Sequence, residues 1–255
     1  TRKTMQGLAD QKFGDAGPAN DSEVTLTSFD RDAEDRVVAA SLYPHTSLSL
    51  SQVKEKVRGM QSREKAEIIE AYLGRRQNRR HKPWRAFELA YYTFDILGNY
   101  GIYRDLQRHR ILTQIRQLLS TKNGYDTPAE LIEAGFANKY HDAMQLAREA
   151  HEEIAAQFPK EAQYIVPFGY RIRWFFTLNA RQIFNMVELR TVKQGHPDYR
   201  KICQEIFHKV REVHPEIVAN MKFVDLNTYD MERDDAEKLI DRKIESLKKK
   251  YGPSS

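Results

Sequence analysis

The stretch "YRIRWFFTLNARQIFNMVELR" (residues 170–190) changes its periodicity halfway along. In its first half, aromatic and aliphatic residues surround Arg171 and Arg173, which predicts a β-strand over residues 168–178 with both arginines on one face. From Asn179, a favoured helix N-cap, the pattern predicts a helix over residues 179–190. The sequence therefore predicts a strand that leads directly into a helix.

The corner between this strand and this helix gathers polar side chains. Arg173 precedes the corner, Asn179 and Arg181 lie at it, and Asn185 and Arg190 follow along the helix. A helix N-terminus attracts anions, because its free amide groups and its dipole both point there. The two asparagines add donors and acceptors of the kind that recognise the edge of a pyrimidine or flavin ring. The segment is a candidate anion site, with ordinary salt bridges and an asparagine cap as the alternative.

A second basic stretch, "YRDLQRHRILTQIRQLL" (residues 103–119), places arginines and a histidine beside an aliphatic run. As a helix, it would set His109 and Thr113 in one stripe, with Ile111 and Ile115 on the opposite side. A helix that is apolar on two opposed faces is usually buried on both, so we predict a helix at a subunit interface. Its arginines then need anionic partners, either carboxylates or the phosphates of a ligand.

The remaining patterns predict a helix-rich α+β protein. Further strands are predicted at residues 24–30 and 86–97, and "RRQNRRHKPWR" (residues 75–85) is predicted to be a charged loop. Apolar spacing and capping signals predict helices at residues 32–40, 49–60, 62–76, 138–158, 197–213 and 230–250, together with a short helix capped by Thr127.

Composition limits the class of protein. Of 255 residues, 40% are hydrophobic and 30% are charged, as in a soluble globular domain, and no apolar run approaches the roughly 18 residues that span a bilayer. The single cysteine, Cys203, excludes an internal disulfide and suits a reducing cytoplasm. The eight histidines lack the spacing of a zinc motif, so we predict no metal site.

Charge and motifs restrict the chemistry further. A net charge of +5 and a pI of about 9.1 suit phosphate-bearing ligands about as well as nucleic acid. No glycine-rich nucleotide loop and no Gly-x-Ser-x-Gly elbow occur, so side chains would have to hold a nucleotide. The arginines of residues 75–85 beside Trp84 are a candidate nucleic-acid contact. Because no reading motif accompanies them, we predict no nucleic-acid partner.

Together, the two basic stretches resemble the ThyX family, the flavin-dependent thymidylate synthases. The resemblance spans roughly residues 35–215 and is strongest over 166–200, which is similar to the family's strand, "N-A-R" turn and "L-R" helix. "AFELAYYTF" resembles the family's "F-E-H-x-x-F-T-F" strand, and "RHRILT" resembles its "R-H-R-x-x-S" motif. The resemblance implies a ThyX-like α+β fold with a small antiparallel sheet and with sites at subunit interfaces.

The resemblance also implies an activity: methylation of dUMP to dTMP by reduced FAD and methylenetetrahydrofolate, with NADPH as reductant, in a cytoplasmic homo-oligomer. Flavin contacts are implied for Arg108, His109, Arg110, Thr113, Asn179 and Arg181. Nucleotide contacts are implied for Arg173, Asn185 and Arg190, and Arg190 would be the catalytic residue that polarises dUMP. The expected organisation is a polar linker or frayed terminus at 1–23, a ThyX-like domain at 24–220, and a basic helix and tail at 221–255.

The chain departs from the family where the nucleotide phosphate should be gripped. Arg116 replaces an acidic residue, Leu118 a serine and Ser120 the phosphate-binding arginine, while Asp105 stands in place of a glutamine. Three hypotheses stay open: a diverged enzyme forming a tetramer; the C-terminal half of a tandem protein forming a dimer; and a non-catalytic domain that holds flavin or completes an oligomer. The polar start without methionine favours a piece of a longer chain, and a trimmed N-terminus is the alternative.

Overall fold

The computed structural model describes the whole chain except residues 1, 15, 18–21, 230–240 and 248–255. Its strands are β1 (Val24–Phe29), β2 (Tyr91–Asn99), β3 (Thr113–Arg116) and β4 (Arg171–Asn179). Its α-helices are α1 (Arg2–Phe13), α2 (Ala33–Leu42), α3 (Leu50–Arg58), α4 (Ser62–Leu73), α5 (Tyr100–Leu106), α6 (Ala129–Glu133), α7 (Ala137–Gln157), α8 (Ala180–Arg190), α9 (Pro197–Val213) and α10 (Pro215–Val218). Short 3₁₀ helices are η1 (Tyr43–His45), η2 (Arg85–Leu89) and η3 (Glu161–Ile165).

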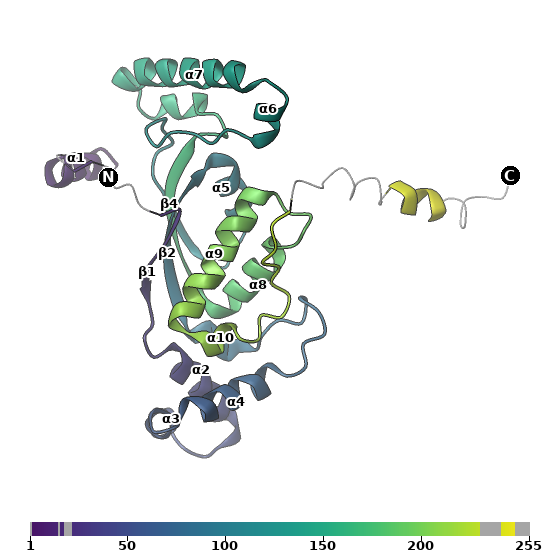
Figure 1. Ribbon diagram of the computed structural model, residues 1–255. Helices are drawn as coiled ribbons and strands as arrows, with labels where there is room; N and C mark the ends of the chain where they lie inside the picture. The colour runs from purple at the N-terminus through teal and green to yellow at the C-terminus, as the bar shows by residue number, and fades with distance from the viewer. Residues whose placement is uncertain (1, 15, 18–21, 230–240, 248–255) are drawn as a thin grey trace.

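The four strands form one antiparallel sheet in the order β1-β2-β4-β3. Strands β2 and β4 pair along their full length, with Tyr91 opposite Asn179 and Asn99 opposite Arg171. Successive side chains point to opposite faces, so Phe94 and Trp174 are buried on one face. Figure 1 shows α8 and α9 side by side against the sheet. The predicted α+β architecture with a small antiparallel sheet is confirmed.

The junction between β4 and α8 contains no loop. Asn179 is the last residue of β4 and also the N-cap of α8, where its side-chain oxygen accepts a hydrogen bond from Gln182 N at 2.9 Å. Below the junction, Ile183, Phe184 and Val187 bury one side of α8 in the core. The predicted strand, helix and asparagine cap are confirmed.

The predicted helix over residues 103–119 is wrong beyond its first turn. Helix α5 ends at Leu106, and the chain then turns into strand β3. Strand β3 pairs with Trp174–Thr177 of β4, so that β4 does not end the sheet with unpaired backbone groups. Ile111 and Ile115 are 65% and 56% exposed on this segment. The two-faced helix inferred from the helical projection therefore does not exist, because pairing with β4 overrides the local helical pattern.

Other element boundaries differ from the predictions by a few residues or by type. The strand predicted at 86–97 starts only at Tyr91, because η2 precedes it. The helix predicted at 62–76 ends at Leu73, because the next residue, Gly74, takes a φ of 64°.

The predicted cap of the short helix is also wrong: Thr127 does not cap α6, whose N-cap is Pro128. Helix α1 lies within the predicted polar linker. The helix predicted at 230–250 falls mostly outside the described residues, although residues 241–247 are helical.

A buried ion pair attaches the segment after α4 to α8. Arg76 donates to both carboxylate oxygens of Glu188, at 2.8 and 2.5 Å, and the two side chains are only 4% and 1% exposed. The Arg76 guanidinium also lies 5.1 Å from the ring centre of Phe184. Because neither charge has access to water, each depends on the other for its compensation.

We predict that Glu188→Ala lowers the free energy of unfolding by about 3–5 kcal/mol, because it leaves Arg76 buried without its counter-charge. Urea unfolding followed by circular dichroism measures this change. The control is Glu67→Ala, which removes the exposed pair of Arg63 and Glu67 and should cost less than about 1 kcal/mol. Equal losses in the two variants would contradict this prediction.

Candidate functional site

Arg190, the last residue of α8, is fixed by three residues from two other parts of the chain. Its Nε donates a hydrogen bond to His109 Nε2 at 3.2 Å, and its Nη2 donates to the backbone carbonyl of Asp105 at 2.8 Å. The Asp105 carboxylate lies 3.5 Å from Nη1, and the Tyr199 ring centre lies 5.3 Å from the guanidinium carbon. These contacts set the plane of the guanidinium without using all of its five N–H groups, so Arg190 is preorganised for an electron-rich ligand.

His109 is buried between two positions of α8. Its Nε2 accepts from Arg190, and its Nδ1 lies 3.1 Å from the side-chain amide nitrogen of Gln182. Burial, and then the positive charge of Arg190, lower the pKa of His109 to about 4. His109 is therefore a neutral support for Arg190 at pH 7. Its predicted flavin contact stays a prediction.

Asn179 and Arg181 lie together at the β4–α8 corner, as the sequence predicts. The Asn179 side chain is used as the helix cap. Arg181 donates from Nε to the backbone carbonyl of Pro83 at 2.7 Å and pairs through Nη1 with Glu88 at 2.8 Å. Both residues thus take part in the cap and the salt bridge that the sequence offers as an alternative, and their predicted flavin contacts stay predictions.

Three other predicted flavin residues, Arg108, Arg110 and Thr113, are exposed. They lie in the turn after α5 and at the start of β3, on either side of the buried His109. Within the part of the chain that the structure describes, their side chains form no hydrogen bond or ion pair. These side chains are available to an anionic ligand.

Arg173 lies on the opposite face of the sheet from α8. It alternates along β4 with the buried Ile172 and Trp174, and it pairs with Asp95 of β2 at 2.9 Å. A cavity of about 450 Å³ opens on this face, lined by Thr27, Thr93, Asp95, Ile115, Arg116, Gln117, Arg173, Trp174 and Phe175. Within one chain, the sheet thus separates Arg173 from Arg190, although the resemblance to the ThyX family implies that both contact one nucleotide.

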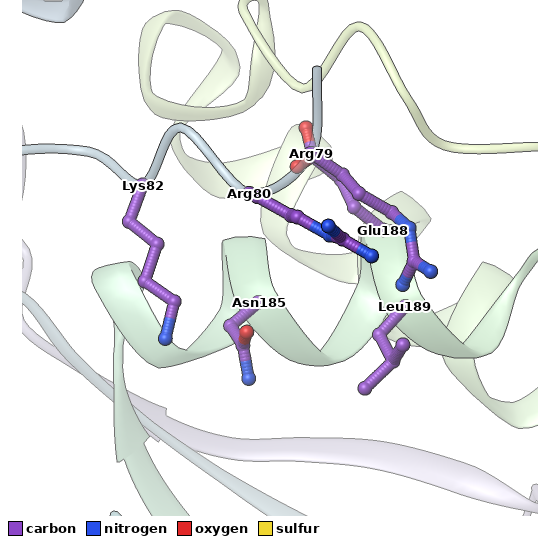
Figure 2. A pocket seen from close by; sticks show the side chains of 6 residues that line it. All are labelled: Arg79, Arg80, Lys82, Asn185, Glu188 and Leu189. Atoms are coloured by element: carbon purple, nitrogen blue, oxygen red, sulfur yellow. The ribbon is translucent and has the colours of Figure 1, made fainter.

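Asn185 lines a second, smaller cavity of about 140 Å³ over α8. Its other lining residues are Arg79, Arg80, Lys82, Glu188 and Leu189. Figure 2 shows the three cationic side chains reaching down from the loop toward α8, where Asn185 lies. The sequence patterns by themselves assign none of these cations to the nucleotide site. The signal for them is the arginine-rich composition of the loop, which in the sequence indicates only a candidate nucleic-acid contact.

The segment that departs from the family's phosphate loop is fixed by internal hydrogen bonds. Arg116 donates to the side-chain oxygen of Gln163 at 3.0 Å, and the same oxygen accepts from the backbone of Leu119 at 3.1 Å. Leu118 is exposed, and Ser120 offers no positive charge. These hydrogen bonds fix the segment within the chain, and Ser120 supplies no cation at its position.

Nucleophilic and metal chemistry gain no support from the geometry. Burial raises the pKa of the Cys203 thiol to about 12, so the thiol stays protonated at pH 7. Among the described residues, no three His, Cys, Asp or Glu side chains are grouped as metal ligands would be.

The described helices include none with the length and apolar character needed to cross a membrane.

Comparison with known proteins identifies the family of this chain. The family model described as thymidylate synthase complementing protein matches residues 25–216. A UPF0159 protein of Chlamydia pneumoniae is 40% identical over 232 residues, which cover 91% of this chain but 44% of the relative. A flavin-dependent thymidylate synthase of Sulfurisphaera tokodaii is 26% identical over 211 residues, 76% of this chain and 75% of the relative. The chain spans about half the length of the UPF0159 relatives that it matches.

Solved structures share the fold at low sequence identity. A UMP/dUMP methylase from Streptomyces cacaoi, bound with 5-Br dUMP, has a TM-score of 0.60 at 15% identity, covering 77% of this chain and 92% of that one. ThyX from Helicobacter pylori, complexed with FAD and dUMP, has a TM-score of 0.56 at 19% identity, covering 78% and 99%. The predicted ThyX-like fold is thereby confirmed, and the chain belongs to the thymidylate synthase complementing protein (ThyX) family.

Proposed function

We propose that this chain contributes to a FAD-dependent site that methylates dUMP, with methylenetetrahydrofolate as methyl donor and NADPH as reductant. The observation that carries the proposal is the fixed guanidinium of Arg190 at the end of α8. A rigid fork of N–H donors suits the carbonyl oxygens of a pyrimidine ring, on which negative charge develops during attack by the ring carbon. Because His109 is neutral, it orients Arg190 without repelling its charge.

The residues available for flavin support the same proposal. Arg108 and Arg110 are exposed cations near Arg190, and no carboxylate among the described residues pairs with them. Two such cations fit the diphosphate of FAD, and the Thr113 hydroxyl adds a hydrogen-bond donor. When bound and reduced, the flavin would supply the electrons that convert the transferred one-carbon unit into a methyl group. No protein nucleophile is required, in keeping with the protonated Cys203.

The proposed site is shared between two ThyX-like domains. Arg173 and Arg190 lie on opposite faces of one sheet, so they can hold one nucleotide only if a second domain brings its own Arg173 or its equivalent. This second domain would be another copy of the chain or another part of a longer polypeptide, which is consistent with relatives about twice as long.

A non-catalytic role is the second candidate function. It is favoured by the Asp105 carboxylate, which lies against Arg190 and reduces the positive charge that a nucleotide would meet. It is also favoured by the internal bonding of Arg116, in the segment that lacks the family's phosphate grip. In this role, the domain would hold flavin or complete an oligomer without turnover.

The first test is spectroscopic. We expect the purified protein to take up FAD and to show the absorbance of bound flavin, with a spectral shift when dUMP is titrated. Exchange of both Arg108 and Arg110 for alanine should weaken FAD uptake roughly tenfold, because two charge-assisted contacts to the diphosphate are lost. A protein that binds no FAD would contradict the cofactor assignment. Flavin binding with no response to dUMP would support the non-catalytic role.

The second test concerns Arg190. Arg190→Ala should lower dUMP affinity or turnover by about a hundredfold or more, because the preorganised donors are lost. Calorimetric titration with dUMP and single-turnover flavin oxidation measure this loss. Arg211→Ala, which removes an exposed arginine of α9, is the charge-matched control. If the two variants behave alike, Arg190 has only a structural role.

A third test uses the pKa of His109. The unfolded chain has a histidine pKa of about 6.5, whereas the folded value is about 4, so between these values only the unfolded chain binds the proton. The free energy of unfolding therefore carries no penalty from His109 above pH 6.5. As the pH falls from 6.5 toward 4, proton uptake by the unfolded chain lowers the free energy of unfolding by up to about 3 kcal/mol. Urea unfolding of the wild type and of His109→Gln at pH 7.5 and 4.5 measures the effect. Equal decreases in both proteins would contradict it.

A further inference from the structure

The arginine-rich loop at residues 76–83 is anchored to α8 at both of its ends. At its start, Arg76 forms the buried pair with Glu188 and also donates from Nε to the backbone carbonyl of His81 at 2.6 Å. At its end, the backbone carbonyl of Pro83 accepts from Arg181 Nε at 2.7 Å. Both anchors compensate charges or polar groups that lie at least partly buried, so the position of the loop over α8 is defined by the fold.

Between the two anchors, the loop presents three cations: Arg79, Arg80 and Lys82. Within the described part of the chain, none of these side chains has an ion-pair partner or a hydrogen-bond acceptor. Glu188, the acidic residue that lines the same cavity, is already paired with Arg76 and cannot neutralise them. The cavity therefore keeps a positive charge that its own lining does not balance.

The floor of the cavity adds a polar group suited to a ligand. Asn185 lies on α8 beneath the three cations, and its amide has no hydrogen-bond partner among the residues that the structure describes (Figure 2). An amide offers two N–H donors to an oxyanion. Three cations and one amide around a common space form a donor set for a phosphate group, which accepts several charge-assisted hydrogen bonds.

The size of the cavity distinguishes a phosphate from a whole ligand. Its volume of about 140 Å³ is well below the roughly 300–1,000 Å³ of sites that enclose small molecules. The space suits one end of a larger molecule, whose remainder lies outside. A phosphate ester of a nucleotide fits this description, because the charged end is small and the ring is bound elsewhere.

We propose that Arg79, Arg80 and Lys82, with Asn185, form a phosphate-binding subsite over α8. This subsite takes the place of the phosphate grip that the chain lacks around Ser120. The phosphate belongs either to the pyrimidine nucleotide or to the flavin, and the shared chemistry is a phosphate ester. The identity of the ligand rests on the proposed function, whereas the phosphate site rests on the cavity alone.

The experiment compares a triple variant, Arg79→Ala, Arg80→Ala and Lys82→Ala, with the wild type. Calorimetry measures the affinity for dUMP and deoxyuridine, which differ by the phosphate, and for FAD and riboflavin, which differ by the diphosphate and its adenosine. Inorganic pyrophosphate, followed by phosphorus NMR, reports the phosphate site without any ring. The control removes three exposed cations of α3, Lys54, Lys56 and Arg58, and so changes the net charge equally.

We expect the triple variant to bind dUMP or FAD about 10- to 100-fold more weakly, and pyrophosphate correspondingly more weakly, with the control unchanged. Affinity for deoxyuridine or riboflavin should not change. A loss confined to dUMP assigns the subsite to the nucleotide, and a loss confined to FAD assigns it to the flavin. Asn185→Asp should also weaken binding, because it adds a negative charge to the floor of the cavity.

Two results would overturn the inference. The first is equal pyrophosphate and phosphate-ester affinities in the wild type, the triple variant and the α3 control. The second is binding of a single-stranded DNA oligomer that neither dUMP, FAD nor pyrophosphate displaces, which would assign the loop to nucleic acid. If the wild type binds pyrophosphate through these residues but neither dUMP nor FAD, the proposed function fails while the phosphate subsite stands.

Discussion

The hydrogen bond from Gln182 N to the Asn179 side chain ends β4 and begins α8 in a single step. Because no loop intervenes, α8 leaves the sheet in one direction, and its side chains point to fixed neighbours. Arg181 meets the loop at Pro83, and Arg190 meets Asp105 and His109. A flexible connection at this corner would leave the same residues without a defined arrangement. The placement of every candidate ligand contact on α8 therefore depends on this cap.

The ion pair of Arg76 and Glu188 extends this arrangement to a second segment. Buried charges are costly unless compensated, and here the compensation ties the segment after α4 to the last turn of α8. The loop that follows is thereby held over α8, with Arg79, Arg80 and Lys82 reaching toward that helix. A stabilising interaction and a candidate binding surface thus share one anchor, and the pair links the stability of the chain to the geometry of its cations.

The arginines fall into two classes by their partners. Arg173, Arg181 and Arg190 each contact a carboxylate of the chain: Asp95, Glu88 and Asp105, respectively. Arg79 and Arg80 of the arginine-rich loop, and Arg108 and Arg110 of the turn after α5, have no such partner among the described residues. The first class is held in place by carboxylates of the chain, and the second leaves its charge available to a ligand. Residue type alone does not separate the two classes, because the difference lies in which carboxylates the fold brings near.

Local sequence patterns determined the strand of 171–179, the helix that follows it, its asparagine cap and the long helices α7 and α9, because periodicity and capping act over a few residues. The same reasoning failed at residues 103–119, where the choice between helix and strand depended on pairing with β4, far away in the chain. Only the tertiary structure decided that Arg173 and Arg190 lie on opposite faces of the sheet. It also decided that the cations of the arginine-rich loop and Asn185 line one cavity. These relations depend on long-range pairing and on buried charge compensation, which a reading of neighbouring residues does not contain.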